Sequence, residues 1–100
     1  MATDPLFRMT VQDVFSIRGR GTVVTGQIES GTLTVGDELS FRREGVLKKT
    51  IVTGIEAFRK SLQHANTGDN VGVLLRDINK PDIQRGDVLT GSESEFTWNP

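Results

Sequence analysis

Residues 11–26, VQDVFSIRGRGTVVTG, decide the fold, because two apolar-rich runs lie on either side of a glycine-rich turn. Glycine tolerates positive φ, so the turn at residues 18–21 predicts a reversal between two paired strands. We expect these strands to cover about Met9–Ile17 and Thr22–Glu29.

The rest of the chain continues the β pattern, with Val, Ile, Thr and Phe in short runs separated by Gly, Asp and Asn. Further strands are predicted at about Glu38–Arg43, Val46–Phe58, Asn70–Leu75 and Asp87–Thr90. We expect a loop at residues 59–69 and one helical turn at residues 83–86. No segment has a sustained helical period. The pattern predicts an all-β fold, a small six-stranded closed barrel, because closure leaves few open edges.

The length of 100 residues predicts a single domain. We expect an N-terminal lead-in at residues 1–8, the barrel at 9–91 and a flexible tail at 92–100. The net charge of −1 gives no overall basic field to hold nucleic acid. Cysteine is absent, and neither a signal peptide nor a membrane-spanning run is visible, which favours a cytoplasmic protein.

Signals for enzymatic chemistry are missing from the sequence. Gly21 and Gly26 have the spacing of a phosphate-binding loop, but Gln27 and Ile28 follow where lysine and a hydroxyl are needed. His64 is the single histidine, so a metal site is not expected, and we expect this side chain to be exposed. The sequence therefore predicts a non-enzymatic protein without cofactor, metal or small-molecule substrate.

Strand alternation assigns side chains to two faces of the sheet. Those expected to fill the core are Val24, Ile28, Leu47, Ile51, Ile55, Ala57, Val71, Val73 and Leu75. Those expected to point outward are Val23, Thr25, Val52, Glu56, Phe58, Asn70 and Leu74. Such an apolar patch with polar groups set in it is typical of a binding surface. Scattered exposed apolar residues are also normal, and the loop at 59–69 could cover some of them.

The first strand breaks the alternation, since Val11, Val14, Phe15 and Ile17 cannot all face one side of a regular strand. A bulge near Gln12–Val14 would reconcile them, because an extra residue re-aims the side chains that follow. Alternatively, Phe15 covers one end of the barrel.

A second group of charges flanks the turn at residues 44–45. Its members are Arg42, Arg43, Lys48 and Lys49. A basic hairpin tip could touch phosphates, but such charges more often solubilise a hairpin and protect an edge, which is the interpretation we favour.

Three blocks of sequence carry a family resemblance. They are DVFSIRGRGTVVTGQIESG at 13–31, TGIEAFRKSL at 53–62, and TGDNVGVLLRDI at 67–78 followed by IQRGDVL at 83–89. The chain resembles domain II of the translational GTPases, most of all that of elongation factor Tu. The resemblance implies a translation-factor barrel and a role in protein biosynthesis.

The resemblance also implies a site for the aminoacylated 3′ end of transfer RNA, or a contact with ribosomal RNA. Glu56 would meet the terminal ribose or base, and Leu74 would form an apolar wall. The aminoacyl side would be lined by Asp13, Phe15, Phe58 and Asn70, with Arg20 and Thr25 at the rim. Gln12 occupies a position where the family usually carries glutamate, which weakens a contact to the aminoacyl ammonium.

The GTPase domain that precedes this barrel in the family is absent from the sequence, so we expect the isolated barrel to bind RNA weakly. The alternative is a protein-interaction module that docks a separate GTPase or another translation-related protein. The starting methionine and the unfamiliar end SESEFTWNP favour a free-standing product over an excised piece of a longer factor.

Overall fold

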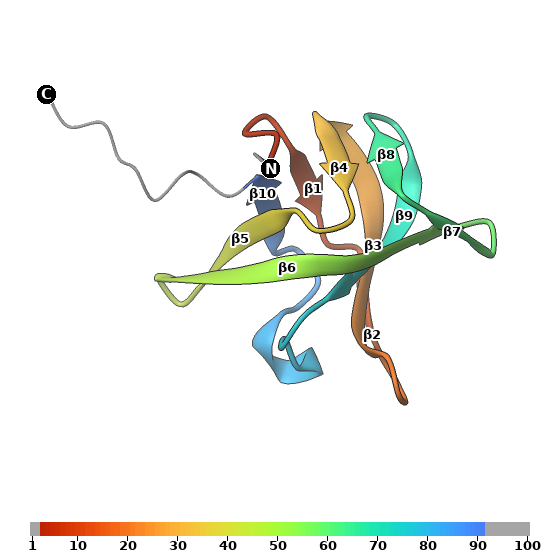
Figure 1. Cartoon of the computed structure of the whole chain (residues 1–100). Coiled ribbons are helices and arrows are strands. Elements are labelled where there is room, and N and C mark those ends of the chain that lie inside the picture. The colour runs from red at the N-terminus through yellow and green to blue at the C-terminus, as the bar shows by residue number, and fades with distance from the viewer. Residues whose placement is uncertain (1–2, 92–100) are drawn as a thin grey trace, which may run out of the picture.

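Six strands close into an antiparallel barrel in the computed structural model, which describes residues 3–91 (Figure 1). Around the ring the order is β1 (Arg8–Thr10), β10 (Val88–Gly91), β5 (Glu38–Arg43), β6 (Val46–Ala57), β9 (Asn70–Leu75) and β3 (Gly21–Ser30). The pairing of β3 with β1 completes the ring. The predicted all-β class and the closed six-stranded barrel are therefore confirmed.

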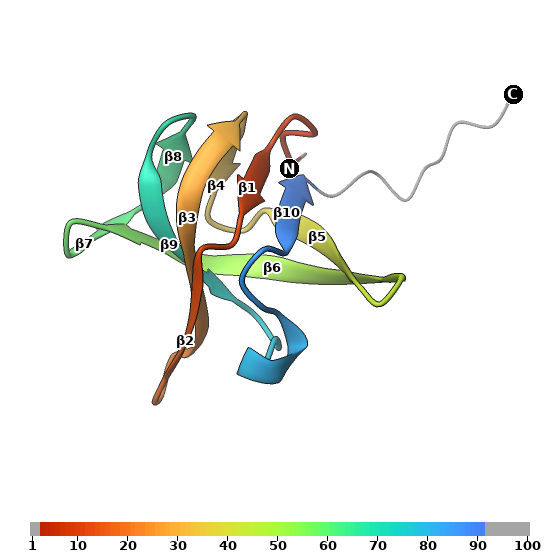
Figure 2. The ribbon, with the colours of Figure 1, turned by 180° about the vertical axis from the view of Figure 1, so that it is seen from behind.

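Short elements surround this ring (Figure 2). β2 (Asp13–Ile17) pairs with β3 outside the ring, and β7 (Lys60–Leu62) pairs with the end of β6. β4 (Thr32–Thr34) and β8 (His64–Asn66) form a separate two-stranded sheet. Residues 59–69 thus hold two strands, where a loop was expected. The helical turn is the 3-10 element η1 (Lys80–Asp82), before the predicted position at residues 83–86.

A β-bulge divides the predicted first strand into β1 and β2. Met9 lies opposite Ile28, and Asp13 lies opposite Thr25. Between these two pairs, the predicted first strand contains one residue more than β3. The backbone N–H of Gln12 donates to the carbonyl oxygen of Thr25 at 2.7 Å. The extra residue lies between Met9 and Asp13, just before most of the predicted range at residues 12–14, because β2 pairs regularly from Asp13 onward. The bulge carries the chain from the ring onto the projecting β2.

A second irregularity, in β6, corrects part of the predicted alternation. The register with β9 shifts between Val52 and Gly54, so Val52 and Ile55 both point into the core although their numbers differ by an odd step. In the part of β6 before the shift, the residues predicted to face the core point outward, and those predicted to point outward face the core. The predictions that Leu47 and Ile51 fill the core and that Val52 points outward are therefore wrong, and Leu47 is 47% exposed.

The core gathers inward side chains from every strand of the ring. Its buried members are Phe7, Met9, Val11, Val24, Ile28, Leu33, Leu39, Phe41, Val52, Ile55, Ala65, Val71, Val73, Leu75, Ile78, Ile83 and Leu89. The predictions for β3 and β9 hold, since Val24, Ile28 and Val71 are among them with Val73 and Leu75. Each fully buried aliphatic side chain contributes about 1.5–3 kcal/mol relative to an exposed one, so this cluster dominates the stability.

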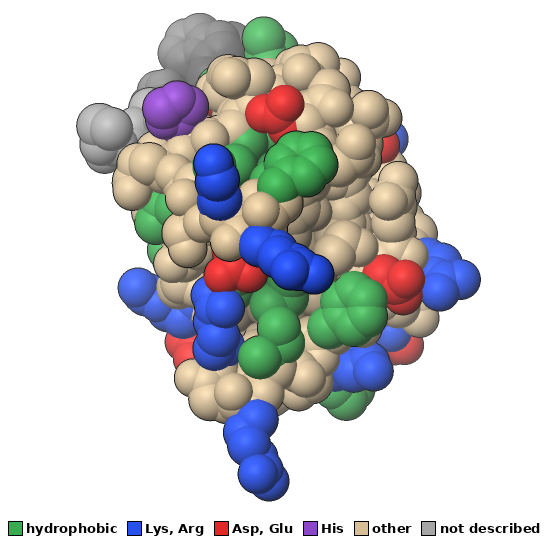
Figure 3. All heavy atoms as spheres, turned by 90° about the vertical axis from the view of Figure 1, so that its right-hand side faces the viewer, with side chains coloured by type: hydrophobic (Ala, Val, Ile, Leu, Met, Phe, Trp, Pro, Cys, Tyr) green, Lys and Arg blue, Asp and Glu red, His purple; other side chains and the backbone are tan. Residues whose placement is uncertain are grey.

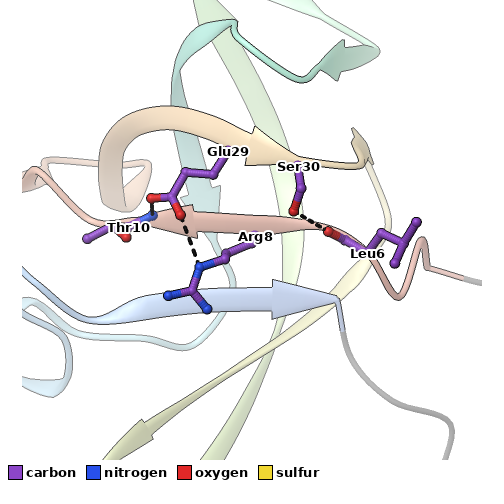
Figure 4. A network of polar contacts seen from close by, with 5 residues as sticks. All are labelled: Leu6, Arg8, Thr10, Glu29 and Ser30. Carbon is purple, nitrogen blue, oxygen red and sulfur yellow. Dashed lines mark hydrogen bonds and ion pairs between the residues drawn. The ribbon is translucent and has the colours of Figure 1, made fainter.

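Polar contacts fasten the start of the chain to the barrel (Figure 4). The Asp4 carboxylate accepts hydrogen bonds from the backbone N–H groups of Leu6 and Thr32, which lower the pKa of Asp4. The Glu29 carboxylate accepts from Thr10 and pairs with Arg8 at 3.0 Å, and these contacts lower the pKa of Glu29. The expected lead-in is thus anchored from Asp4 onward, and the expected tail at 92–100 lies outside the described residues.

Candidate functional site

Strand register places several predicted site residues in one row across the outer face of the barrel. Asp13 lies opposite Thr25, Thr25 opposite Gly72, and Gly72 opposite Glu56. Directly paired residues of an antiparallel sheet share a face. The row therefore runs from β2 across β3 and β9 to β6, with no side chain at its third position.

A second, parallel row is apolar. Phe15 lies opposite Val23, Val23 opposite Leu74, and Leu74 opposite Gly54. Val23 and Leu74 point outward as predicted but are 6% and 5% exposed, so they do not form part of an exposed apolar patch. Leu74 is therefore not an open wall for a ligand, as the resemblance implied. The two side chains form a buried layer outside the main core.

Two strand glycines explain why this layer is buried. A Cβ added to Gly54 would lie 3.3 Å from Cδ1 of Leu74, and one added to Gly72 would lie 3.3 Å from Cγ1 of Val23. The neighbouring side chains therefore lean over the glycines and take the space that a side chain would fill. Glycine inside a strand often marks a place where another backbone or a ligand approaches closely.

A shallow hollow opens beside this layer, over the paired strands β3, β9 and β6. Its lining consists of Gln12, Thr25, Gly26, Glu56, Ala57, Phe58, Asn70, Val71 and Gly72. Five of the nine predicted site residues meet here, from four separate parts of the chain. A second hollow shares Ala57, Phe58 and Asn70 with it and continues toward Lys60, Leu62 and Asp69.

Phe58 is the most exposed large apolar residue of the described chain, at 91%. β6 ends at Ala57, so Phe58 belongs to the turn before β7 and not to the strand that was predicted to include it. Phe58 and Arg59 have φ values of 52° and 66°, in the left-handed region that bulky residues rarely adopt. Backbone strain of this kind clusters at functional sites. The turn holds an aromatic ring in water at the edge of the hollow.

Arg20 links the β2–β3 turn to the row of polar residues. Its Nη2 lies 2.6 Å from Oε2 of Glu56, and the two side chains are 47% and 34% exposed. Gly19 and Gly21 on either side of it have φ values of 80° and 100°, which suits the predicted glycine turn. Arg20 therefore stands beside the hollow and neutralises its carboxylate without lining it.

The remaining predicted residues lie next to the hollow and not in its wall. Asp13 is the cross-strand neighbour of Thr25, and its Oδ1 pairs with Nη2 of Arg85 at 3.3 Å. Phe15 is 47% exposed on β2, beyond Val23. Leu74 lies beneath the surface. The structure thus separates the nine residues into five that line the hollow and four that flank it.

The sequence analysis missed Gly72, which has no side chain in the outer row, and Gly26, which also lines the hollow although a Cβ there would point toward Met9 and Thr10 of β1. It also missed Lys60 and Leu62 on β7. A glycine within the apolar run 70–75 was a visible signal, because glycine is depleted from strands. Nothing in the sequence marks β7, which lies in a segment expected to be a loop.

The face that carries these elements, on the right-hand side of Figure 1, shows hydrophobic side chains interspersed with basic and acidic ones (Figure 3). The elements around the hollow carry aromatic rings at positions 15 and 58, cations at 20, 59 and 60, and a carboxylate at 56. Such a surface offers stacking area, charge and hydrogen-bond partners to one ligand.

The basic β5–β6 hairpin forms a separate feature. Glu44 and Gly45 at its turn have positive φ, Arg42 donates to the carbonyl of Gly45, and Arg43 lies 4.0 Å from Asp87. Val46 and Leu47 are exposed here. Part of the positive charge is therefore engaged within the hairpin and the barrel.

Two further observations concern only residues 3–91. Within them, no helix has the length and apolar character to cross a bilayer. No cluster of His, Cys, Asp and Glu in this part of the chain could hold a metal ion, and His64 is exposed as expected.

Comparison with known families supplies an identity for the barrel. Residues 21–90 match the family described as elongation factor Tu domain 2. The match covers more than half of the chain, so the chain belongs to this family and is a translation-factor domain.

Proposed function

We propose that this member of the elongation factor Tu domain 2 family binds the aminoacylated 3′ end of transfer RNA at the hollow between Gln12, Thr25, Glu56, Phe58 and Asn70. The observation that supports it is the convergence of these five side chains, from four separate parts of the chain, around Gly72. The family resemblance implies all five, and strand alternation independently predicts that Thr25, Glu56, Phe58 and Asn70 point outward.

The chemistry of the hollow suits a nucleoside that carries an acyl group. RNA ends are recognised by stacking on aromatic side chains and by hydrogen bonds to base edges and sugar hydroxyls. Phe58 offers an exposed ring, Glu56 offers acceptor oxygens for ribose hydroxyls, and Thr25 and Asn70 offer neutral hydrogen-bond partners. Gln12 adds a neutral amide at a position where a carboxylate would attract the ammonium group of the aminoacyl ester more strongly.

Arg20 supplies the charge that a phosphate backbone needs. Its ion pair with Glu56 is partly exposed, so water and salt screen it and its net contribution to stability is at most about 1 kcal/mol. A phosphate can therefore replace the carboxylate at low cost. We infer that Arg20 moves from Glu56 to the RNA backbone and leaves the carboxylate free for the terminal sugar.

The test is an amide NMR titration of the full chain with an aminoacylated transfer-RNA acceptor stem, compared with the same stem uncharged. We expect shifts at Gln12, Glu56, Phe58 and Asn70, with weak affinity because a single domain supplies few contacts. The shifts should be larger for the charged stem. Absence of shifts at these residues at millimolar RNA would refute the proposal.

A fragment of ribosomal RNA serves as the matched competitor. Shifts at the same residues with this fragment, but not with either stem, would assign the hollow to the ribosome and contradict binding of the aminoacyl end. Arg42→Ala, on the β5–β6 hairpin, is the control for charge alone and should leave the titration unchanged.

A further inference from the structure

β2 has an open outer edge. Within the described chain it pairs with β3 alone and stands last in the order of its sheet. An antiparallel strand directs the N–H and C=O groups of alternate residues to each side, so about half of those on β2 face no strand. Proteins usually protect such edges with charge, proline or a cover. The segment DVFSI is mostly apolar and has a charge only at its first residue.

A groove runs beside the beginning of this edge. Asp13 and Val14 of β2 line it, facing Lys80 and Pro81 of η1 together with Ile83, Gln84 and Arg85. It shares no residue with the hollow described above. The groove thus combines a strand edge, apolar side chains and two cations in one place.

The charges around the edge are available to a ligand. Lys80 and Arg18 make no ion pair within the described part of the chain. Arg85 pairs with Asp13, but these side chains are 75% and 51% exposed, so solvent screens the contact and an incoming carboxylate can replace it. Cations therefore stand near both ends of β2.

We propose that this edge binds an extended acidic segment of a partner protein, which adds as a strand to β2 and enters the groove. The backbone of the segment would satisfy the open groups of β2, and strand addition of this kind is a common mode of peptide recognition. Its apolar side chains would pack on Phe15 and Ile17, which are 47% and 38% exposed. Its carboxylates would meet Arg18, Lys80 and Arg85.

A peptide fits this edge better than RNA does. Phosphates could pair with the cations, but they cannot match the regular succession of donors and acceptors along a strand edge. The proposal goes beyond the RNA site, since it uses none of the residues that line the hollow and involves another class of ligand.

The test uses a short capped peptide of alternating valine and threonine with a glutamate at each end, added to the full chain and followed by amide NMR. We expect shifts along β2 and at residues 80–85. N-methylation of alternate residues along the paired edge of the peptide should weaken binding about tenfold, through loss of two or more hydrogen bonds. N-methylation along the other edge should change it little.

Variants of the protein separate charge from backbone pairing. Lys80→Glu and Arg18→Glu should each weaken the peptide about two- to fivefold, and Arg42→Glu on the distant hairpin should not. Equal binding of all N-methylated peptides would overturn the proposal, because it would show attraction without strand addition. Shifts along β2 with an RNA oligonucleotide but not with the peptide would also overturn it.

Discussion

The interior of the barrel and its outer face over β3, β9 and β6 are built from the same strands, but they follow different rules. Inside, large side chains from every strand leave the core residues almost wholly buried. Outside, the same strands carry Gly54, Gly72 and the register shift at Val52–Gly54, and β6 gives way to the strained turn at Phe58. Close packing of large side chains builds the core, whereas a strand glycine and a strained turn shape the hollow.

The physical reason is that the two faces meet different requirements. An interior must be close-packed, so each position is held to an apolar side chain of suitable size. A solvent-facing sheet surface has no such demand, so glycines and bulges are tolerated there at modest cost. We therefore expect substitutions inside the barrel to cost more stability than substitutions on its outer face.

The largest effect is expected inside the barrel. Ile55→Ala should lower the free energy of unfolding by about 2–5 kcal/mol, since it removes a fully buried side chain. Leu47→Ala, on the same strand but before the register shift, should change it by about 0.5 kcal/mol or less. Urea denaturation measures both. Similar losses for the two variants would show that the alternation of β6 is not inverted.

A side chain at Gly72 should damage the outer face. Gly72→Val places methyl groups in the hollow and crowds Val23, so we expect a loss of about 1–3 kcal/mol in stability and loss of RNA binding. Ser61→Val, at the end of the same row on β7, is the matched control and should leave both unchanged. Retained binding by the Gly72 variant would show that the ligand does not approach this strand.

The turn at Phe58 should separate stability from binding. Asparagine tolerates the left-handed conformation, so Phe58→Asn should leave the free energy of unfolding unchanged or raise it by about 0.5 kcal/mol. Binding of the acceptor stem should fall about tenfold, because stacking of one base on an aromatic ring is lost. A marked loss of stability would mean that the Phe58 ring packs on the barrel and is not exposed to solvent.

The smallest effect concerns pH. The pKa values of Asp4 and Glu29 are lowered in the folded state, so their contacts stabilise the protein above their ordinary values of 3.8 and 4.5. This contribution declines as the pH falls through that range toward the lower folded pKa values. Asp4→Asn with Glu29→Gln should flatten the acid limb of the unfolding midpoint plotted against pH. An unchanged acid limb in the double variant would contradict the assignment.

The ring and much of the core could be predicted because they depend on local pattern. The bounds of β5 and β9 coincide with the predicted segments, and the inward positions of β9 follow from simple alternation. The bulge near Gln12 was visible because four apolar residues conflicted with a period of two. The inversion within β6 was not, since Leu47 and Ile51 share the spacing of the truly buried Ile55 and were therefore assigned to the core with it.

The candidate site was predicted in part for a similar reason. Resemblance and alternation selected Glu56 and Asn70, but burial of Leu74 depends on Gly54, a neighbour on another strand that no local pattern connects to it. β7 and β8 are too short and polar to give a strand signal, and they form because β6 and β4 offer them edges. The burial of Leu74 and the formation of β7 and β8 therefore depend on cross-strand partners, which a local sequence pattern does not identify.

The seam between β1 and β10 has a consequence for how this barrel can be used. The N–H of Gly91 donates to the carbonyl of Phe7 at 3.0 Å, so the chain leaves the described fold beside the point where it came in. A unit with such neighbouring ends can be spliced into a host polypeptide, or moved between hosts, as a cassette. The opposite end of the barrel, which carries the β2–β3 turn, would remain accessible to other domains of the host polypeptide.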